Sequence, residues 1–306
     1  MEKLRALLVS TDLSPRANHA LARAAMLARE HGAGLTAQHV VARGADTDTL
    51  PEEWSRRLLG VAAATEDFRQ RARETLQTKL ETLTPGATPA QVQVDAGVPF
   101  VEIIRAARSS NADLVVLGGH GWHSLREWLL GTTAERVIRK GDRPVLIVKK
   151  PPKGPYRRLL VAVDFSETSK RALALAVRMA PKARVALLNV YDFGLAEPLR
   201  AGGTTSEELL LLQQTYEQQR RERLVAFARE AGLDPDKAQL LVRYGYPGLV
   251  INAVAAEQRA HLVAVGTQGL SGLRYVLLGS VAEHVLRESR CDVLAVHPGT
   301  VPFELP

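Results

Sequence analysis

The stretch Arg5-Ala6-Leu7-Leu8-Val9-Ser10-Thr11-Asp12-Leu13-Ser14 decides the fold, because it recurs as Arg157-Arg158-Leu159-Leu160-Val161-Ala162-Val163-Asp164-Phe165-Ser166. The two aspartates are 164 − 12 = 152 positions apart. Later segments recur at an offset of 148: Gly97-Val98-Pro99 returns as Gly245-Tyr246-Pro247, and Gly131-Thr132 returns as Gly279-Ser280. Repeats of this length exclude a solenoid. The sequence therefore predicts two copies of one domain, at residues 1–150 and 155–300, held close together by a short proline-rich linker.

The composition of the 306-residue chain is that of an ordinary globular protein, with 46% apolar and 24% charged residues. No apolar run approaches the roughly 18 residues of a membrane helix, and the start of the chain does not have the pattern of a secretory signal. The single cysteine, Cys291, fits a reducing compartment. We expect a cytoplasmic protein that does not bind membranes.

A net charge of +7 raises the question of nucleic-acid binding. The basic residues are interspersed with acidic ones along predicted helices, as at residues 66–74 and 220–223. Such mixing is typical of a solvated helix face, and aromatic residues that could stack on bases are only 5% of the chain. We therefore do not expect nucleic acid among its partners.

Within each copy, short apolar runs alternate with helical periodicity. In the first copy the run that ends at Asp12 is followed by Ser14-Pro15, which predicts a helix capped by the serine with proline in its first position. That helix is expected to end at Gly32. Strands alternating with helices indicate right-handed crossovers and a five-stranded parallel sheet covered on both faces, a Rossmann-like α/β fold. The strands expected after the first are residues 35–41, 92–94, 114–117 and 145–148, with 240–242, 262–265 and 293–296 in the second copy, and a long helix is expected at residues 52–83 and 206–231.

A glycine loop follows the fourth predicted strand in both copies. Gly118-Gly119-His120-Gly121 precedes Gly131-Thr132 by nine residues, and Gly266-Thr267-Gln268-Gly269 precedes Gly279-Ser280 by the same nine. Glycines there allow a sharp turn and a close approach of the backbone to a ligand. The third glycine comes where a helix begins, so free N–H groups face an incoming anion, and the hydroxyl can cap the helix or donate to a phosphate.

With these loops and the aspartate that closes the first strand, the chain resembles a tandem universal stress protein over nearly its whole length. The resemblance implies two adenine-nucleotide-binding domains that bind ATP or a related nucleotide, with or without Mg²⁺, in a sensor or regulator of the stress response. It implies adenine near the aspartate and a valine of the second strand, and phosphates at the glycine loop and hydroxyl. The residues so implied are Asp12, Val40, Gly118, Gly121, Gly131 and Thr132 in the first copy, and Asp164, Val190, Gly266, Gly269, Gly279 and Ser280 in the second.

The second copy is the better match, because the first carries the bulky rings of His120, Trp122 and His123 in its loop. These rings could narrow a phosphate pocket, or the imidazoles could contact phosphate. Two structural interpretations stay open: the aspartates could only cap the following helices, and the glycines could serve turns alone.

The sequence offers no catalytic or metal-binding residues. His120 and His123 are half of a metal site at most, and the nucleophile elbow, the Walker loop and the Rossmann dinucleotide pattern are missing. A slow ATPase stays open, although no general base can be named. The alternatives are a scaffold or interaction protein with vestigial sites, and a slow phosphohydrolase on the same fold.

Two apolar segments suggest association. The last strand of each copy, at residues 145–148 and 293–296, would be an exposed sheet edge if left alone. The resemblance implies that the two copies pair within the chain, or that chains form a homodimer. Leu209 to Leu212 cannot all face one core, so we expect part of this run to meet another domain or subunit.

Overall fold

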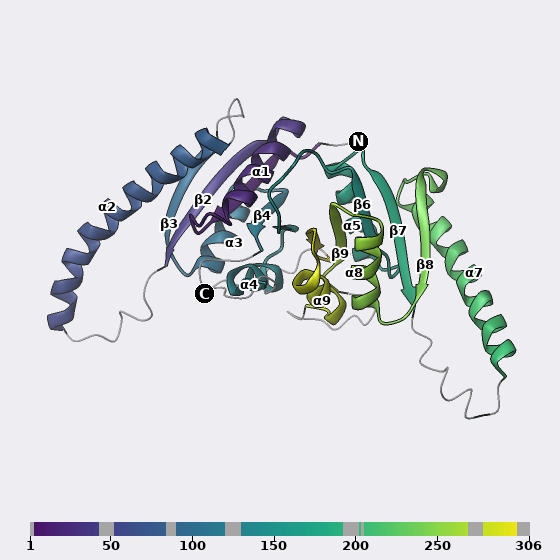
Figure 1. Ribbon diagram of the computed structural model, residues 1–306. Coiled ribbons are helices and arrows are strands. Elements are labelled where there is room, and N and C mark those ends of the chain that lie inside the picture. Colours follow the sequence, from purple (N-terminus) through teal and green to yellow (C-terminus); the bar gives the residue numbers. More distant parts are fainter. Residues whose placement is uncertain are drawn as a thin grey trace. The chain divides into compact units, whose positions relative to one another are not determined.

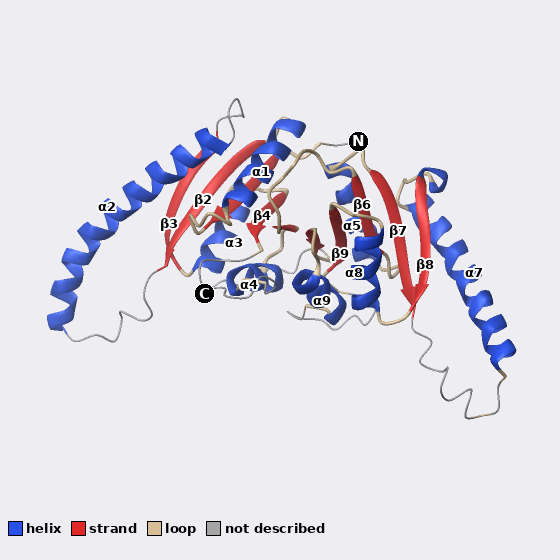
Figure 2. Cartoon of the chain, viewed as in Figure 1, coloured by secondary structure: helices blue, strands red, loops and turns tan. Residues whose placement is uncertain are grey.

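The computed structural model describes residues 3–42, 52–83, 90–119, 130–191, 202, 205–268 and 278–298 (Figure 1). The chain divides into two compact units, called here the first unit (residues 2–154) and the second unit (residues 155–300). In each unit, strands alternate with helices along the chain (Figure 2).

The first unit is a five-stranded sheet in which all neighbouring strands are parallel, in the order β3-β2-β1-β4-β5. Helices α1 and α2 pack on one face, and α3 and α4 pack on the other. The elements are β1 (Ala6–Thr11), α1 (Asn18–His31), β2 (Gly34–Ala42), α2 (Glu52–Leu83), β3 (Ala90–Gly97), α3 (Pro99–Ser109), β4 (Leu114–Gly118), α4 (Thr132–Lys140) and β5 (Val145–Val148).

The second unit repeats this topology with the parallel order β8-β7-β6-β9-β10. Here α5 and α7 lie on one face, and α8 and α9 on the other. The predicted α/β fold with two parallel-sheet domains is therefore confirmed. Its elements are β6 (Arg158–Ala162), α5 (Glu167–Met179), β7 (Arg184–Tyr191), α7 (Ser206–Glu230), the short 3-10 helix η2 (Pro235–Lys237), β8 (Ala238–Tyr244), α8 (Pro247–Glu257), β9 (Leu262–Gly266), α9 (Ser280–Glu288) and β10 (Asp292–Val296).

The central strands are apolar because both of their faces are covered. Leu8, Val9, Leu160 and Val161 are all fully buried in β1 and β6. Strand order reverses beside these strands, since the chain moves from β1 to β2 on one side and later adds β4 on the other. A crevice forms at such a reversal, beyond the carboxyl ends of the strands. The fold thus provides a candidate site between β1 and β4, and another between β6 and β9.

Two predicted boundaries differ from the structure. The expectation that Ser14 caps a helix starting at Pro15 is wrong, because α1 begins at Asn18. The intervening residues form a tighter turn, in which the N–H of His19 donates to the carbonyl of Arg16 at 3.2 Å. The edge strands β3 and β8 are also longer than the short apolar runs predicted, because an edge strand keeps polar residues such as Gln91 on its solvated side.

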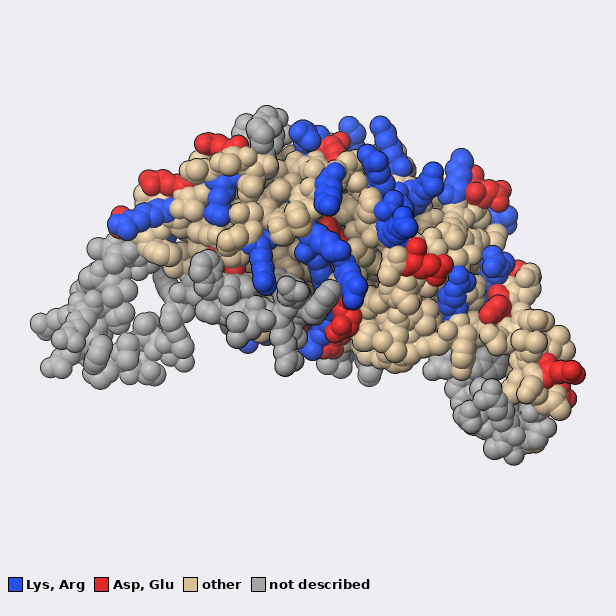
Figure 3. Space-filling model, viewed as in Figure 1, with Lys and Arg blue, Asp and Glu red and all other residues tan. Residues whose placement is uncertain are grey.

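Basic and acidic side chains are mixed on the surface, as Figure 3 shows for one face. On α2, Arg69 pairs with Glu66 at 3.1 Å and Arg71 pairs with Asp67. These i,i+3 and i,i+4 pairs are the arrangement expected of a solvated helix face. Within the described residues, no helix is both long and apolar enough to cross a membrane.

Candidate functional site

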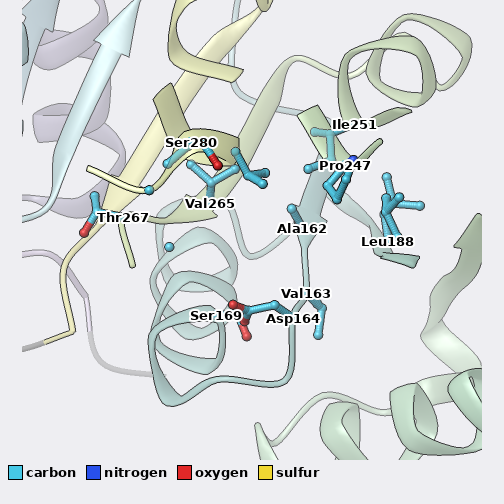
Figure 4. Close-up of a pocket in the computed structure, with 15 residues that line it drawn as sticks. Ala162, Val163, Asp164, Ser169, Leu188, Pro247, Ile251, Val265, Thr267 and Ser280 are labelled. Atoms are coloured by element: carbon cyan, nitrogen blue, oxygen red, sulfur yellow. The ribbon is translucent and has the colours of Figure 1, made fainter. Parts of the chain in front are cut away.

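A cavity of about 290 Å³ lies at the carboxyl edge of the sheet in the second unit (Figure 4). Leu188, Pro247 and Ile251 form one end of it, and Thr267 lies at the opposite end. Its volume is near the lower end of the range of about 300–1,000 Å³ for small-molecule sites. The full lining is Ala162, Val163, Asp164, Ser169, Leu188, Val190, Pro247, Ile251, Val265, Gly266, Thr267, Gly279, Ser280, Val281 and Ala282.

Five of the six residues predicted for the second copy line this one cavity, although more than a hundred positions separate the first from the last. They come from different elements: Asp164 follows β6, Val190 is in β7, Gly266 ends β9, and Gly279-Ser280 begins α9. The sixth, Gly269, lies outside the described residues.

The N-terminus of α9 opens on the cavity with unfilled hydrogen-bond donors. Gly279 is the N-cap, and no side chain in the described part of the chain caps the helix. The first backbone bond runs from the N–H of Glu283 to the carbonyl of Gly279, at 2.9 Å. The preceding N–H groups of the first turn therefore point toward the cavity mouth, where the helix dipole favours an anion. Of the two roles considered for the Ser280 hydroxyl, capping is excluded, because Ser280 is the first helical residue.

Asp164 is fixed by a local turn. Its Oδ1 accepts hydrogen bonds from the N–H and the hydroxyl of Ser166, at 3.0 and 2.6 Å. Ser166 in turn caps α5, its Oγ accepting from the N–H of Ser169 at 3.1 Å. Asp164 thus supports a helix cap indirectly while it also lines the cavity, so the structural and ligand-binding interpretations are compatible.

Gly266 has a packing reason to be glycine. A Cβ built on it would lie 2.8 Å from Cγ2 of Thr168, which is buried at the start of α5. Real Cβ atoms do not approach so closely, so a side chain at this position requires a shift of α5 or of the loop. This glycine therefore serves local packing, a structural role different from the turn considered for it from the sequence.

The first unit brings its predicted residues to the corresponding edge. Asp12 follows β1 and is fixed as its counterpart is, Oδ1 accepting from the N–H of Ser14 at 3.0 Å. The N–H of Gly131 donates to the carbonyl of Gly119 at 3.2 Å, which ties the start of α4 to the end of β4. The other residues predicted for this copy are Val40 in β2, Gly118 at the end of β4 and Thr132 at the start of α4, while Gly121 and the rings of His120, Trp122 and His123 lie outside the described residues.

As in the second unit, the N-cap of α4 is a glycine and no described side chain caps this helix. The hydroxyl of Thr132 is therefore not a cap either. The N–H groups of the first turn of α4 are left for an anion in the same way.

One pair of buried polar residues next to the candidate sites was not predicted. His39 and Asn189 occupy the position before the predicted valines, and each is buried. Nδ1 of His39 lies 2.8 Å from the carbonyl of Thr11, and the amide of Asn189 donates to the carbonyl of Val163 at 2.7 Å. Each side chain therefore holds the end of the first strand against the second. A polar residue in an apolar strand, repeated in both copies, is the signal that could have revealed them.

Tyr191 and His297 are titratable side chains next to the lining of the second site, and Nδ1 of His297 lies 3.4 Å from Oγ1 of Thr267. Burial raises the pKa of Tyr191, the neighbour of Val190, to about 12, so its phenol stays protonated and donates to Glu217 at 3.2 Å. No group of three or more histidine, cysteine or acidic side chains suited to a metal ion occurs in the described residues. The arrangement is equipped to hold a ligand by backbone donors.

Two parallel α/β units, each with a fixed aspartate and a glycine-capped helix at its strand-order reversal, define a tandem protein of the Rossmann-like α/β class. The chain belongs to the universal stress protein family, which it matches twice, over residues 3–149 and 155–297.

The relatives agree with this assignment. The chain is 30% identical over 201 residues to a universal stress protein E homolog of Haemophilus influenzae, covering 62% of this chain and 63% of that protein, which is less than two thirds of its length. It is 33% identical over 147 residues to universal stress protein MJ0531 of Methanocaldococcus jannaschii, covering 48% of this chain and 83% of that one. A crystal structure of a universal stress protein from Archaeoglobus fulgidus superposes with a TM-score of 0.62 over 96% of this chain and 98% of that chain, at 24% identity, which supports the fold.

Proposed function

We propose that each unit binds an adenine nucleotide, ATP or a close relative, and that the protein acts as a cytoplasmic sensor or regulator in the stress response. One observation carries the proposal. Asp164, Val190, Gly266, Gly279 and Ser280, chosen from spacing and family resemblance, line a single cavity of about 290 Å³ at the strand-order reversal.

The chemistry of the cavity suits the two ends of a nucleotide. Apolar side chains, among them Leu188 and Ile251, offer a surface for a flat base. The uncapped start of α9 offers N–H groups and a helix dipole for phosphates. Asp164 is the one carboxylate among the described lining residues, so Mg²⁺ would be held mainly by the phosphates, as Mg²⁺ commonly is.

The test places a negative charge where the phosphates are proposed to bind. Ser280→Glu is expected to abolish binding in the second unit without weakening α9, because an acidic residue in the first turn favours the helix dipole. Thr132→Glu is the matched variant for the first unit. Gln218→Glu, at an exposed position of α7 that is not in the cavity lining, adds the same charge and serves as the control.

Calorimetric titration with ATP, with and without Mg²⁺, reads the number of sites. We expect two sites per chain in the natural protein and in Gln218→Glu, one in each site variant, and none in the double variant. Absence of binding at millimolar ATP, or binding that neither site variant reduces, would overturn the proposal.

A scaffold with vestigial sites is the second candidate, and one observation favours it. Leu210 and Leu211, on α7, are 56% and 65% exposed, and such apolar exposure marks contact surfaces. These two leucines belong to the run from Leu209 to Leu212, part of which is expected to contact another domain or subunit. A protein that binds no nucleotide but changes its sedimentation coefficient in Leu210→Ser and Leu211→Ser variants would support the scaffold. Steady phosphate release from ATP would instead favour the hydrolase alternative.

A further inference from the structure

The floor of the second cavity differs in chemistry from the matching strand positions of the first unit. In the second unit, Ala162 of β6 pairs in register with Leu188 of β7, and both line the cavity. In the first unit the matching register pair is Ser10 with Gln38. An apolar pair in one unit is therefore replaced by two polar side chains in the other.

Gln38 is fully buried, with 0% of its surface exposed. Its Nε2 donates to Oδ2 of Asp95 at 2.7 Å and to the carbonyl of Glu102 at 3.2 Å. A carboxylate and a carbonyl oxygen only accept hydrogen bonds, so they fix the amide with its nitrogen toward β3 and α3. The orientation of the side chain is thereby determined.

The other end of the same amide is left without a donor. Among the described residues, none donates a hydrogen bond to Oε1 of Gln38, and this oxygen is buried. A buried acceptor without a donor costs free energy, about 1–3 kcal/mol, unless a ligand or ordered water supplies one. The bond to Glu102 places the side chain on the α3 face of the sheet, which corresponds to the α8 face that bounds the cavity of the second unit.

The neighbouring positions strengthen the contrast. Val40 pairs in register with Asp95, whereas its counterpart Val190 pairs with Arg243. The first unit thus has a carboxylate where the second has a guanidinium, beside the valine proposed to lie near the base. Oδ2 of Asp95 already accepts from Gln38 and from Nε2 of Gln93, at 2.9 Å, which leaves Oε1 of Gln38 as the acceptor without a described donor. An unpaired acceptor favours a ligand that presents an N–H donor.

We infer that the first unit recognises an amino-bearing purine nucleotide through a hydrogen bond from the amino group to Oε1 of Gln38. The second unit has Leu188 at the corresponding position, and this side chain accepts no hydrogen bond from the amino group. The inference rests on the proposed function and adds a specificity-determining residue to it. The two units then differ in selectivity within one chain.

The test compares ATP with purine riboside 5′-triphosphate, which lacks only the 6-amino group. Full-length Ser280→Glu isolates the first site, and full-length Thr132→Glu isolates the second. For each isolated site, the preference is the Kd of the analogue divided by the Kd of ATP. We expect this ratio to be about tenfold or more larger in the first site than in the second, because the analogue leaves Oε1 unpaired. Gln38→Leu, which copies the second unit, is expected to reduce the preference to that of the second site while far-UV circular dichroism stays unchanged.

If the leucine variant fails to fold, Gln38→Met replaces it, because methionine keeps the side-chain length. This variant is expected to show the same reduced preference for ATP over the analogue. Gln91→Leu, at an exposed position of the neighbouring strand β3, is the control for the loss of an amide and is expected to leave the preference unchanged. Equal preferences in the two isolated sites, or a preference that survives both Gln38 variants, would overturn the inference and leave the proposed function intact. Loss of all ATP binding, or insensitivity to Ser280→Glu and Thr132→Glu, would instead remove the proposed function itself, and the inference with it.

Discussion

Replacing Gly266 by alanine tests whether local packing requires glycine at the end of β9. The new Cβ would lie 2.8 Å from Cγ2 of Thr168, about 0.7 Å closer than the shortest optimal separation of two carbon atoms, roughly 3.5 Å. Overpacking of this kind costs about 1–3 kcal/mol. Alanine restricts the unfolded chain and returns up to about 1 kcal/mol, so the net cost is expected near the lower half of that range.

The partner substitution identifies the atom responsible. Thr168→Ser removes Cγ2 and keeps the hydroxyl, after which the nearest remaining atom is Cβ of residue 168, at 3.2 Å. Alanine at position 266 should then cost at least about 1 kcal/mol less than in the natural background. The two substitutions are therefore expected to be non-additive in a double-mutant cycle.

Hydrogen exchange read by mass spectrometry measures the effect locally. Peptides from β9 should exchange about five- to 30-fold faster in Gly266→Ala, and this acceleration should shrink in the double variant. Peptides from β4, in the other unit, provide the internal reference. Additivity of the two substitutions within about 0.5 kcal/mol would refute the packing argument and return Gly266 to a purely ligand-related role.

Three further predictions concern stability and titration. Asn189→Ala should lower the free energy of unfolding by about 1–3 kcal/mol in urea, because the carbonyl of Val163 loses its donor; destabilisation below about 0.5 kcal/mol would contradict this strand-end role. Leu160→Ala, at a fully buried position of β6, should cost about 2–5 kcal/mol by the same assay, and a smaller loss would mean that this layer of the core can collapse around the cavity. Tyr191 should ionise at about pH 12 in an absorbance titration near 295 nm; since its folded pKa is raised, its contribution to stability is full below about pH 10 and is lost as pH rises toward 12, and Tyr191→Phe should remove this alkaline loss.

The sequence predicted the elements that depend on strong local signals. Repeated apolar runs and the glycine at position 32 located the buried strands and the end of α1, where Gly32 has the left-handed φ of 66°. It placed the first turn of α1 too early, because a serine followed by proline also begins a tight turn before the helix proper. The lengths of the edge strands were underestimated. One face of an edge strand is solvated, so polar residues alternate with apolar ones and shorten the apolar run.

The site was predictable where it uses backbone geometry and less so where it uses tertiary contacts. Spacing alone placed Gly279 before a helix, and the structure has it as the N-cap of α9. Two features of the site join residues that are far apart in the sequence: the bond from Asn189 to Val163 spans 26 positions, and the close approach of position 266 to Thr168 spans 98. No local sequence pattern predicts such pairs. The polar floor at Gln38 became visible only through the register of β1 and β2.

The turn that holds Asp164 has a consequence for the energetics of binding. Its side chain is held by the N–H and the hydroxyl of Ser166, at 3.0 and 2.6 Å, which are bonds within the chain itself. A flexible carboxylate would lose about 0.5–1.5 kcal/mol of rotamer freedom when a ligand immobilised it. In this protein the side chain loses its rotamer freedom during folding, when the helix cap forms. Asp164 is therefore preorganised, and a ligand that contacts it would lose less free energy to side-chain ordering.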